Sequence, residues 1–319
     1  MSRKSNWTAY LLTILVLYFL FCMISEPAKY ISKSLDGISA WAMSVLPSVL
    51  PFMFFTKVLS SLDCMQSFTR PFSAVGKTLF TSPPISFYTF LMAIMSGYPV
   101  GSKMVADLFL QGKITREDAF KMTSFCSTSG PMFIIGAVGI GMFKNQTIGY
   151  ILFISHVLGA ILNGILFGRL KLRQNNSLQD EPPLPQNQNS AQKKSDISEI
   201  VLNSTLAILS VGCIITIFFI VIECFSPLLS LLPDTLRFFV EGVIEITKGC
   251  VDISSLQNLN LATILCSFVI SFGGISTVLQ SLTMLSSIKM PARFFILQKF
   301  CHAIFSTLVT VVLLLIFKI

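Results

Sequence analysis

The chain has 319 residues, of which 53% are hydrophobic and only 12% are charged, and its mean hydropathy is +0.75. Charged residues make up about a quarter of an ordinary soluble domain, so this composition excludes a soluble globular protein. It predicts an all-α polytopic membrane protein instead. The formal net charge of +8 would suggest nucleic-acid binding in a soluble chain. Here the Lys and Arg residues lie in short loops beside apolar segments, where they indicate membrane topology.

The first apolar segment, Trp7 to Ile24, follows Arg3 and Lys4. This pattern fits either the core of a signal peptide or a first membrane span. No small-x-small cleavage site follows Ile24, which favours a retained anchor whose N-terminus lies in the cytoplasm. We assign residues 1–37 to this anchor helix and the loop after it.

The next predicted span, Ile38 to Leu59, carries Pro47 and Pro51 in its middle. Proline lacks a backbone N–H, so two prolines four residues apart remove two hydrogen bonds on one face of a helix. We therefore expect a kink here. Proline kinks are common in membrane helices, so this one alone is weak evidence of function.

A third apolar segment begins at Ile85 and is interrupted within Ser96 to Lys103, where Gly97, Pro99 and Gly101 break the helix at membrane depth. Non-helical backbone persists at this depth only where it is buried in protein or lines a watery cavity. We therefore predict that this stretch forms the floor of a binding site.

A second polar interruption follows in the same half of the chain. Gln111-Gly112 indicates a helix stop, and Thr115 to Asp118 indicates a new helix with an acidic first turn. That helix is expected to run through the break Ser124 to Pro131 into the apolar run Met132 to Phe143, before the span Thr147 to Phe167. The two breaks together predict a pocket built from broken helices.

Residues 169–196 contain Pro182-Pro183-Leu184-Pro185, several Asn and Gln residues and almost no apolar ones. This composition predicts a disordered polar linker outside the membrane. The linker divides the chain into a first repeat, residues 38–168, and a second repeat, residues 197–319.

The second half shows the same order of features as the first. Its segments are Ile197 to Phe225, Phe238 to Asp252, Leu261 to Leu285 with a break at Ser271 to Gly274, and Phe294 to Phe317. Each half thus has a long span, a short polar-interrupted segment, a broken span and a closing span. This order predicts an internal duplication.

Membrane topology suggests that the two repeats are inverted. If every apolar segment crossed the bilayer, the basic linker would lie outside, against the positive-inside rule. A re-entrant hairpin at Ile85 to Leu110 enters and leaves the bilayer on the same side, which removes one crossing and places the linker in the cytoplasm. The second half then has the opposite membrane orientation to the first. Inverted repeats with discontinuous helices are typical of secondary transporters. The basic residues then on the cytoplasmic side are Arg70, Lys77, Lys103, Lys113, Arg116 and Lys121.

The candidate hairpin of the second half carries three charges, Glu241, Glu245 and Lys248. The spacing predicts both carboxylates on one helix face and an ion pair between Glu245 and Lys248. Charges at membrane depth are costly, so they indicate either a substrate pathway or mutual pairing. The alternative is an interfacial helix in water, where such charges cost little.

The hydroxyl cluster Ser127 to Ser129, followed by Gly130-Pro131, could bind a polar ligand at the start of a half-helix. Free backbone N–H groups at such a start attract anions, and Lys103 would add positive charge. The alternative is helix packing through small residues. His156 and His302 each lie in a closing span, where we expect helix contacts rather than contact with substrate or a proton.

Sequence signatures of enzymes are missing. The chain has no H-E-x-x-H, no G-x-S-x-G and no Walker loop, so we expect neither catalysis nor an ATP-driven pump. Its eight cysteines show no C-x-x-C spacing and are interpreted as small apolar residues. No cofactor or metal is expected.

Four motifs in order, Gly97 to Lys103, Ser124 to Gly136, Glu245 to Gly249 and Ser271 to Ser276, resemble the sporulation integral membrane proteins of the YlbJ (SpoVV) type, which carry nucleoside-recognition (Gate) domains. The resemblance covers roughly Ile38 to Phe317. It implies a spore-forming Gram-positive bacterium, the mother-cell-derived membrane around the forespore, and similarity to concentrative nucleoside transporters.

The implied cargo is dipicolinic acid, a small aromatic dicarboxylate. Family members often have Asn in the second break, where this chain has Cys126, Ser127 and Thr128, and this leaves open whether the ligand contacts are the same.

These observations and the resemblance predict a membrane transporter that moves a small organic anion. The expected partners are the lipid bilayer and either further copies of this chain or other sporulation membrane proteins. The alternatives are a non-transporting scaffold or regulator of spore maturation and, less favoured, an intramembrane enzyme. The expected substrate-binding residues are Gly97, Tyr98, Pro99, Gly101, Lys103, Ser127, Thr128, Ser129, Gly130, Glu245, Thr247, Gly273 and Gly274.

Overall fold

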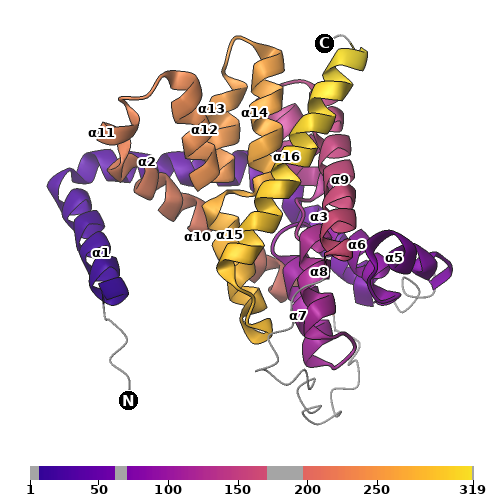
Figure 1. Cartoon of the computed structure of the whole chain (residues 1–319). Coiled ribbons are helices and arrows are strands. Elements are labelled where there is room, and N and C mark those ends of the chain that lie inside the picture. The colour runs from indigo at the N-terminus through magenta and orange to yellow at the C-terminus, as the bar shows by residue number, and fades with distance from the viewer. Residues whose placement is uncertain (1–6, 62–69, 171–196, 318–319) are drawn as a thin grey trace.

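A computed structural model describes residues 7–61, 70–170 and 197–317 (Figure 1). These residues form helices and loops and no strand, which confirms the all-α prediction. Among them, five helices are long and apolar enough to cross a membrane, in agreement with a polytopic membrane protein. They span Pro27–Phe55, Gln146–Arg169, Ile200–Cys224, Leu259–Ile288 and Ala292–Phe317. The predicted linker lies mostly within 171–196, outside the described residues.

The first half of the chain contains α1 (Trp7–Ser25), α2 (Pro27–Ala40), η1 (Trp41–Val45), α3 (Leu46–Ser61), η2 (Arg70–Phe72), α5 (Ser73–Phe80), α6 (Ile85–Ser96), α7 (Val100–Leu110), α8 (Arg116–Cys126), η3 (Met132–Met142) and α9 (Gln146–Arg169). The second half contains α10 (Ile197–Cys224), α11 (Ser226–Leu229), α12 (Asp234–Ile244), α13 (Ile246–Ser254), α14 (Leu259–Phe272), α15 (Gly274–Met284), η4 (Leu285–Ile288) and α16 (Ala292–Phe317).

The expected distortion near Pro47 is present as a single π-helical turn, η1, between α2 and α3. Leu46 N–H donates to the carbonyl of Trp41, five residues back, directly before the proline that cannot donate. Pro51 lies inside α3. The helix begins at Pro27, earlier than the predicted Ile38, because the Pro27–Ala40 segment continues into the span without a break.

The first hairpin consists of α6 and α7, which meet at a tip around Gly97. Gly97 adopts a φ of +74°, a conformation that a residue with a Cβ rarely accepts. The peptide bond between Tyr98 and Pro99 is cis. Gly101 packs against the carbonyl of Cys126, where a methyl group would clash. The predicted glycine-proline break is therefore present, and it is held closely against α8.

The second break separates α8 from η3 over residues 127–131. Thr115 caps α8 as the sequence indicates: its hydroxyl accepts from Asp118 N–H at 3.1 Å, and Thr115 N–H donates to the Asp118 carboxylate at 3.1 Å. The continuation beyond Pro131 is π-helical rather than α-helical.

The second half repeats these features. Helices α12 and α13 form a hairpin so tight that a methyl group on Gly249 would overlap Gly242. Helices α14 and α15 form a broken helix at Gly273 and Gly274, whose φ angles are +91° and +71°. Glycine is required at these positions because both backbones are left-handed.

Two buried apolar clusters each combine elements of both halves. The first joins α6, α7 and α8 to α15, η4 and the start of α16. The second joins η3 and α9 to α13 and α14. Each broken helix therefore contributes one piece to each cluster, so both breaks lie at the boundary between the two clusters.

The closing helices α9 and α16 run antiparallel along each other. Asn163 Nδ2 donates to the Gln298 carbonyl at 3.1 Å, whereas His302 Nε2 donates to the His156 carbonyl at 3.0 Å. Later residues of α9 thus meet earlier residues of α16. Gly159 allows the approach, because a methyl group there would clash with Ser306.

We predict that Gly159→Val lowers the melting temperature of the purified protein markedly, since overpacking a close contact costs about 1–3 kcal/mol. The matched control is Leu162→Val on the same helix, whose side chain is 42% exposed. Thermal unfolding in detergent measures both variants. Equal melting temperatures for the two would contradict a close α9–α16 contact at Gly159.

Candidate functional site

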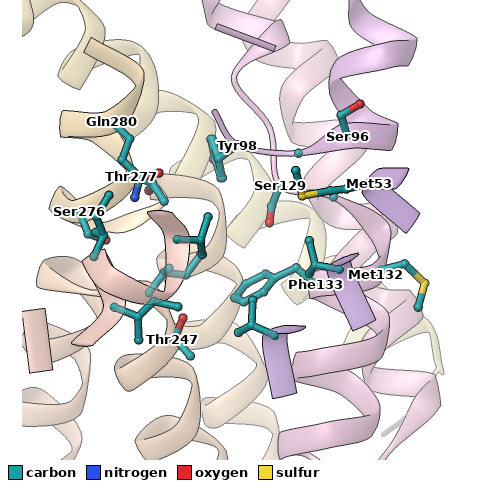
Figure 2. Close-up of a pocket in the computed structure, with 18 of the residues that line it drawn as sticks. Met53, Ser96, Tyr98, Ser129, Met132, Phe133, Thr247, Ser276, Thr277 and Gln280 are labelled. Atoms are coloured by element: carbon teal, nitrogen blue, oxygen red, sulfur yellow. The ribbon is translucent and has the colours of Figure 1, made fainter. Parts of the chain in front are cut away.

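Both hairpin tips, the second break and the first two turns of α15, which follow the fourth break, border one cavity. The first hairpin tip contributes Ser96, Gly97 and Tyr98, and the second break contributes Ser129 and Gly130. From the second half come Glu245 and Thr247 of the α12–α13 tip, and Ser276, Thr277 and Gln280 of α15 (Figure 2).

The rest of the cavity wall is apolar. It comes from η1 and α3, from the middle of α10 and from the start of η3 (Figure 2). A mostly apolar wall with a few convergent polar groups is the usual composition of a small-molecule site. The apolar lining residues are Val45, Val49, Phe52, Met53, Met132, Phe133, Val211, Ile214, Ile215 and Ile246, together with Met95 of α6.

Tyr98 reaches from the first hairpin tip toward the second half of the chain (Figure 2). Its phenol oxygen accepts a hydrogen bond from Lys299 Nζ of α16. The ammonium lies 4.5 Å from the centre of the Tyr98 ring and also donates to the Ser127 carbonyl at 2.8 Å. Lys299 is only 2% exposed, so its amino group is buried directly behind the cavity wall.

His156 joins the two broken helices behind the cavity. Ser129 N–H donates to His156 Nε2 at 2.9 Å, so Nδ1 carries the proton and donates to Ser271 Oγ at 2.9 Å. The His156 and His302 rings lie 4.6 Å apart. Both histidines therefore make helix contacts. The Ser129 amide, expected to be free for an anion, is already occupied.

Glu245 forms the N-cap of α13, and its Oε2 accepts from Lys248 N–H at 2.7 Å. The side chain is 1% exposed. Burial raises the pKa of Glu245 to about 7, although the hydrogen bonds from Lys248 N–H and Thr247 N–H lower it in part. The cavity thus contains a carboxyl group that can be neutral near physiological pH.

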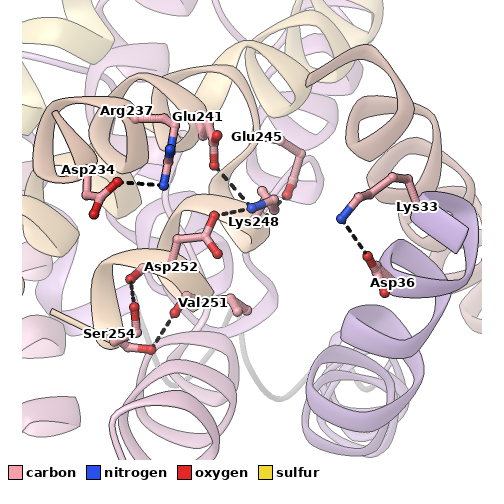
Figure 3. Close-up of polar contacts among 11 residues, drawn as sticks. Lys33, Asp36, Asp234, Arg237, Glu241, Glu245, Lys248, Val251, Asp252 and Ser254 are labelled. Atoms are coloured by element: carbon pink, nitrogen blue, oxygen red, sulfur yellow. Dashed lines mark hydrogen bonds and ion pairs between the residues drawn. The ribbon is translucent and has the colours of Figure 1, made fainter. Parts of the chain in front are cut away.

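The expected ion pair between Glu245 and Lys248 is wrong. Lys248 Nζ instead pairs with Glu241 at 3.1 Å and with Asp252 (Figure 3). The two glutamates do not share one helix face either, because α12 ends at Ile244 and Glu245 has extended backbone angles. The Lys248 charge is therefore neutralised outside the cavity.

The remaining candidate residues have varied positions. Ser127 and Thr128 are buried behind the cavity wall, and no hydrogen-bond partner of their hydroxyls is found among the described residues. Lys103 is exposed on α7 and does not line the cavity, because the tip of the hairpin precedes it by a full turn. Pro99, Gly101, Gly273 and Gly274 shape the breaks without lining the cavity. The candidates on the cavity wall are Gly97, Tyr98, Ser129, Gly130, Glu245 and Thr247.

Four residues at or behind the cavity were not expected from the sequence: Lys299 and the polar residues of α15, Ser276, Thr277 and Gln280. A lysine within an apolar span is a functional signal by default. Lys299 lies only seven residues after Ala292, the start of α16, and could be mistaken for an interfacial residue. The α15 residues follow Gly274 at helical spacing, which is a usable signal once the break is recognised.

The fold and the cavity define an all-helical polytopic membrane protein with a polar site at its helix breaks. A comparison with curated proteins finds the sporulation integral membrane protein YlbJ of Bacillus subtilis (strain 168), to which this chain is 26% identical over 338 residues, covering 93% of this chain and 81% of that protein. No family model matches the chain, so the Gate domain stays a prediction. No solved structure matches it.

We predict that the stability gap between wild type and Glu245→Gln depends on pH. Because the folded pKa is raised, the stabilisation from a protonated Glu245 is complete below about pH 4.5 and is lost as pH rises through about 7. Relative to Glu245→Gln, the wild type should lose free energy of unfolding on the order of 3 kcal/mol over this range.

Melting temperatures between pH 4.5 and 8.5 measure this gap. The control is Glu117→Gln, whose carboxylate is 40% exposed on α8 and pairs with Lys121. A gap that stays constant with pH for Glu245→Gln would contradict the raised pKa.

Proposed function

We propose that the protein is a membrane transporter that carries a small organic anion, with dipicolinic acid as the expected cargo, across the membrane around the forespore. The observation that carries this proposal is that both hairpin tips, the second break and the start of α15 converge on one cavity. Broken helices around a central site are the usual way in which secondary transporters bind their substrates.

The arrangement of the two halves supports alternating access by inverted repeats. Each half has a hairpin, then a broken helix, then a closing helix, in the same order. The closing helices run antiparallel, and the labels in Figure 1 place α12 and α13 at one end of the molecule and α7 at the other. Hairpins that enter from opposite ends can open the site to one side at a time.

The chemistry of the cavity suits a small aromatic acid. The apolar wall of α3, α10 and η3 can pack against a flat ring, while hydroxyl groups of Ser129, Thr247 and Ser276 can donate to oxygen atoms. A protonated Glu245 would not repel an anion, and its raised pKa allows that state near neutral pH. The relative named above is described as a sporulation integral membrane protein, which agrees with a role in spore formation.

The proposal is tested by uptake of labelled dipicolinate into vesicles that contain only this protein. We predict saturable uptake by the wild type and at least a tenfold reduction for Gly130→Leu. Gly130 lies on the cavity wall, and a Cβ there meets its nearest atom at 3.6 Å, so the backbone tolerates a side chain that fills the cavity.

The matched control is Gly141→Leu, a glycine of η3 that does not line the cavity. It should transport at close to the wild-type rate. No uptake by folded wild-type protein under any ion gradient would overturn the proposal and favour a non-transporting scaffold.

A further inference from the structure

We propose that Tyr98 and Lys299 together form the carboxylate-recognition group of the cavity, and that this pair selects anions over neutral ligands of similar shape. The inference rests on the proposed transport function and names the class of substrate, a carboxylate. Tyr98 would contact the ligand, and Lys299 would act through Tyr98 as a positioning residue.

The first observation is the lack of a counter-ion for Lys299. The ammonium is almost fully buried, and its contacts are the phenol oxygen and ring of Tyr98 and the carbonyl of Ser127, all of them neutral. Within residues 7–61, 70–170 and 197–317, no carboxylate forms an ion pair with it. Burying an unpaired charge is costly, so an anion that arrives from outside would stabilise the charged form of this amino group.

Lys248 is a lysine of the same protein whose charge is neutralised by carboxylates, and it serves as a comparison for Lys299. Its Nζ contacts two carboxylates, Glu241 and Asp252, and its side chain is 22% exposed (Figure 3). Lys299 is less exposed to solvent, and no carboxylate of the described residues forms an ion pair with it. Of these two lysines, Lys299 is therefore the one that lacks a counter-ion.

Tyr98 connects Lys299 to the cavity. Its phenol oxygen accepts from Lys299, and its hydroxyl donates to the Ser271 carbonyl at 3.5 Å, the outer limit of a hydrogen bond. Tyr98 also lines the cavity. A ligand oxygen in the cavity could replace this long contact, and a protonated Lys299 would make the hydroxyl a stronger donor.

The arrangement favours a carboxylate over a neutral group. A carboxylate gains from both the hydroxyl hydrogen and the ammonium charge, which act across a low-dielectric site. An amide of the same shape gains only the hydrogen bond. The pair therefore predicts selection of acids against neutral ring compounds, including nucleosides.

A structural role for Lys299 is the competing explanation. The Ser127 carbonyl lies just beyond the C-terminus of α8, where a lysine stabilises the negative end of the helix. A purely capping lysine would change stability without changing which ligands bind. Ligand selectivity therefore separates the two roles.

The test measures binding of pyridine-2,6-dicarboxylate and of its diamide to the purified full chain by calorimetry. The wild type should bind the diacid at least tenfold more tightly than the diamide. Lys299→Met should weaken diacid binding at least tenfold and change diamide binding less than twofold. Lys77→Met, an exposed lysine of α5, is the matched control and should match the wild type.

Tyr98→Phe is the second variant, because it keeps the ring against the ammonium and removes only the hydroxyl. It should weaken diacid binding about threefold to tenfold while the protein remains folded. Wild-type diacid affinity in folded Lys299→Met and Tyr98→Phe would overturn this inference and leave transport standing. Failure of wild-type protein to bind or transport the diacid would remove the proposed function and this inference with it.

Discussion

The structure depends on one constraint: backbone groups that leave a helix at membrane depth must find partners within the protein. The breaks at Gly97, at residues 127–131, at Glu245 and at Gly273 are buried where apolar clusters draw on both halves of the chain. Side chains supply hydrogen-bond partners for the backbone at two of these breaks. His156 accepts from Ser129 N–H, Glu245 accepts from Lys248 N–H, and Lys299 donates to the Ser127 carbonyl. Ser129 and Glu245 also line the cavity, so the contacts that support the breaks are part of the candidate site.

Helix breaks could be predicted from the sequence, whereas the side-chain partners of the buried lysines could not. Glycine and proline act on the local backbone, so Gly97 and Gly273 indicate the breaks without knowledge of the fold. The partner of Lys248 depends on how the α12–α13 tip turns, and a helical spacing rule fails once Glu245 leaves the helix. Lys299 was missed for a related reason. Its partners Tyr98 and Ser127 come from the other half of the chain, and no local pattern connects them.

Charge is distributed unequally around the cavity, and this inequality gives the site its proposed preference. Lys248 is neutralised by two acids outside the cavity, whereas Lys299 has only neutral neighbours behind Tyr98. Glu245 contributes a carboxyl group whose pKa, raised to about 7 by burial, allows it to be uncharged. A small acid that enters such a site would supply the counter-ion that Lys299 lacks, and it would meet apolar surface elsewhere.

The central claim is that the helix breaks surround a solute, and ligand protection of a cysteine in the cavity tests it most directly. In a chain whose eight native cysteines are replaced, the Gln280→Cys variant places a thiol on the cavity wall, and Leu279→Cys places one on the exposed side of the same helix. The account predicts that dipicolinate slows maleimide labelling of the Gln280→Cys variant at least fivefold and leaves the Leu279→Cys variant unchanged. Equal labelling of the Gln280→Cys variant with and without ligand would contradict it.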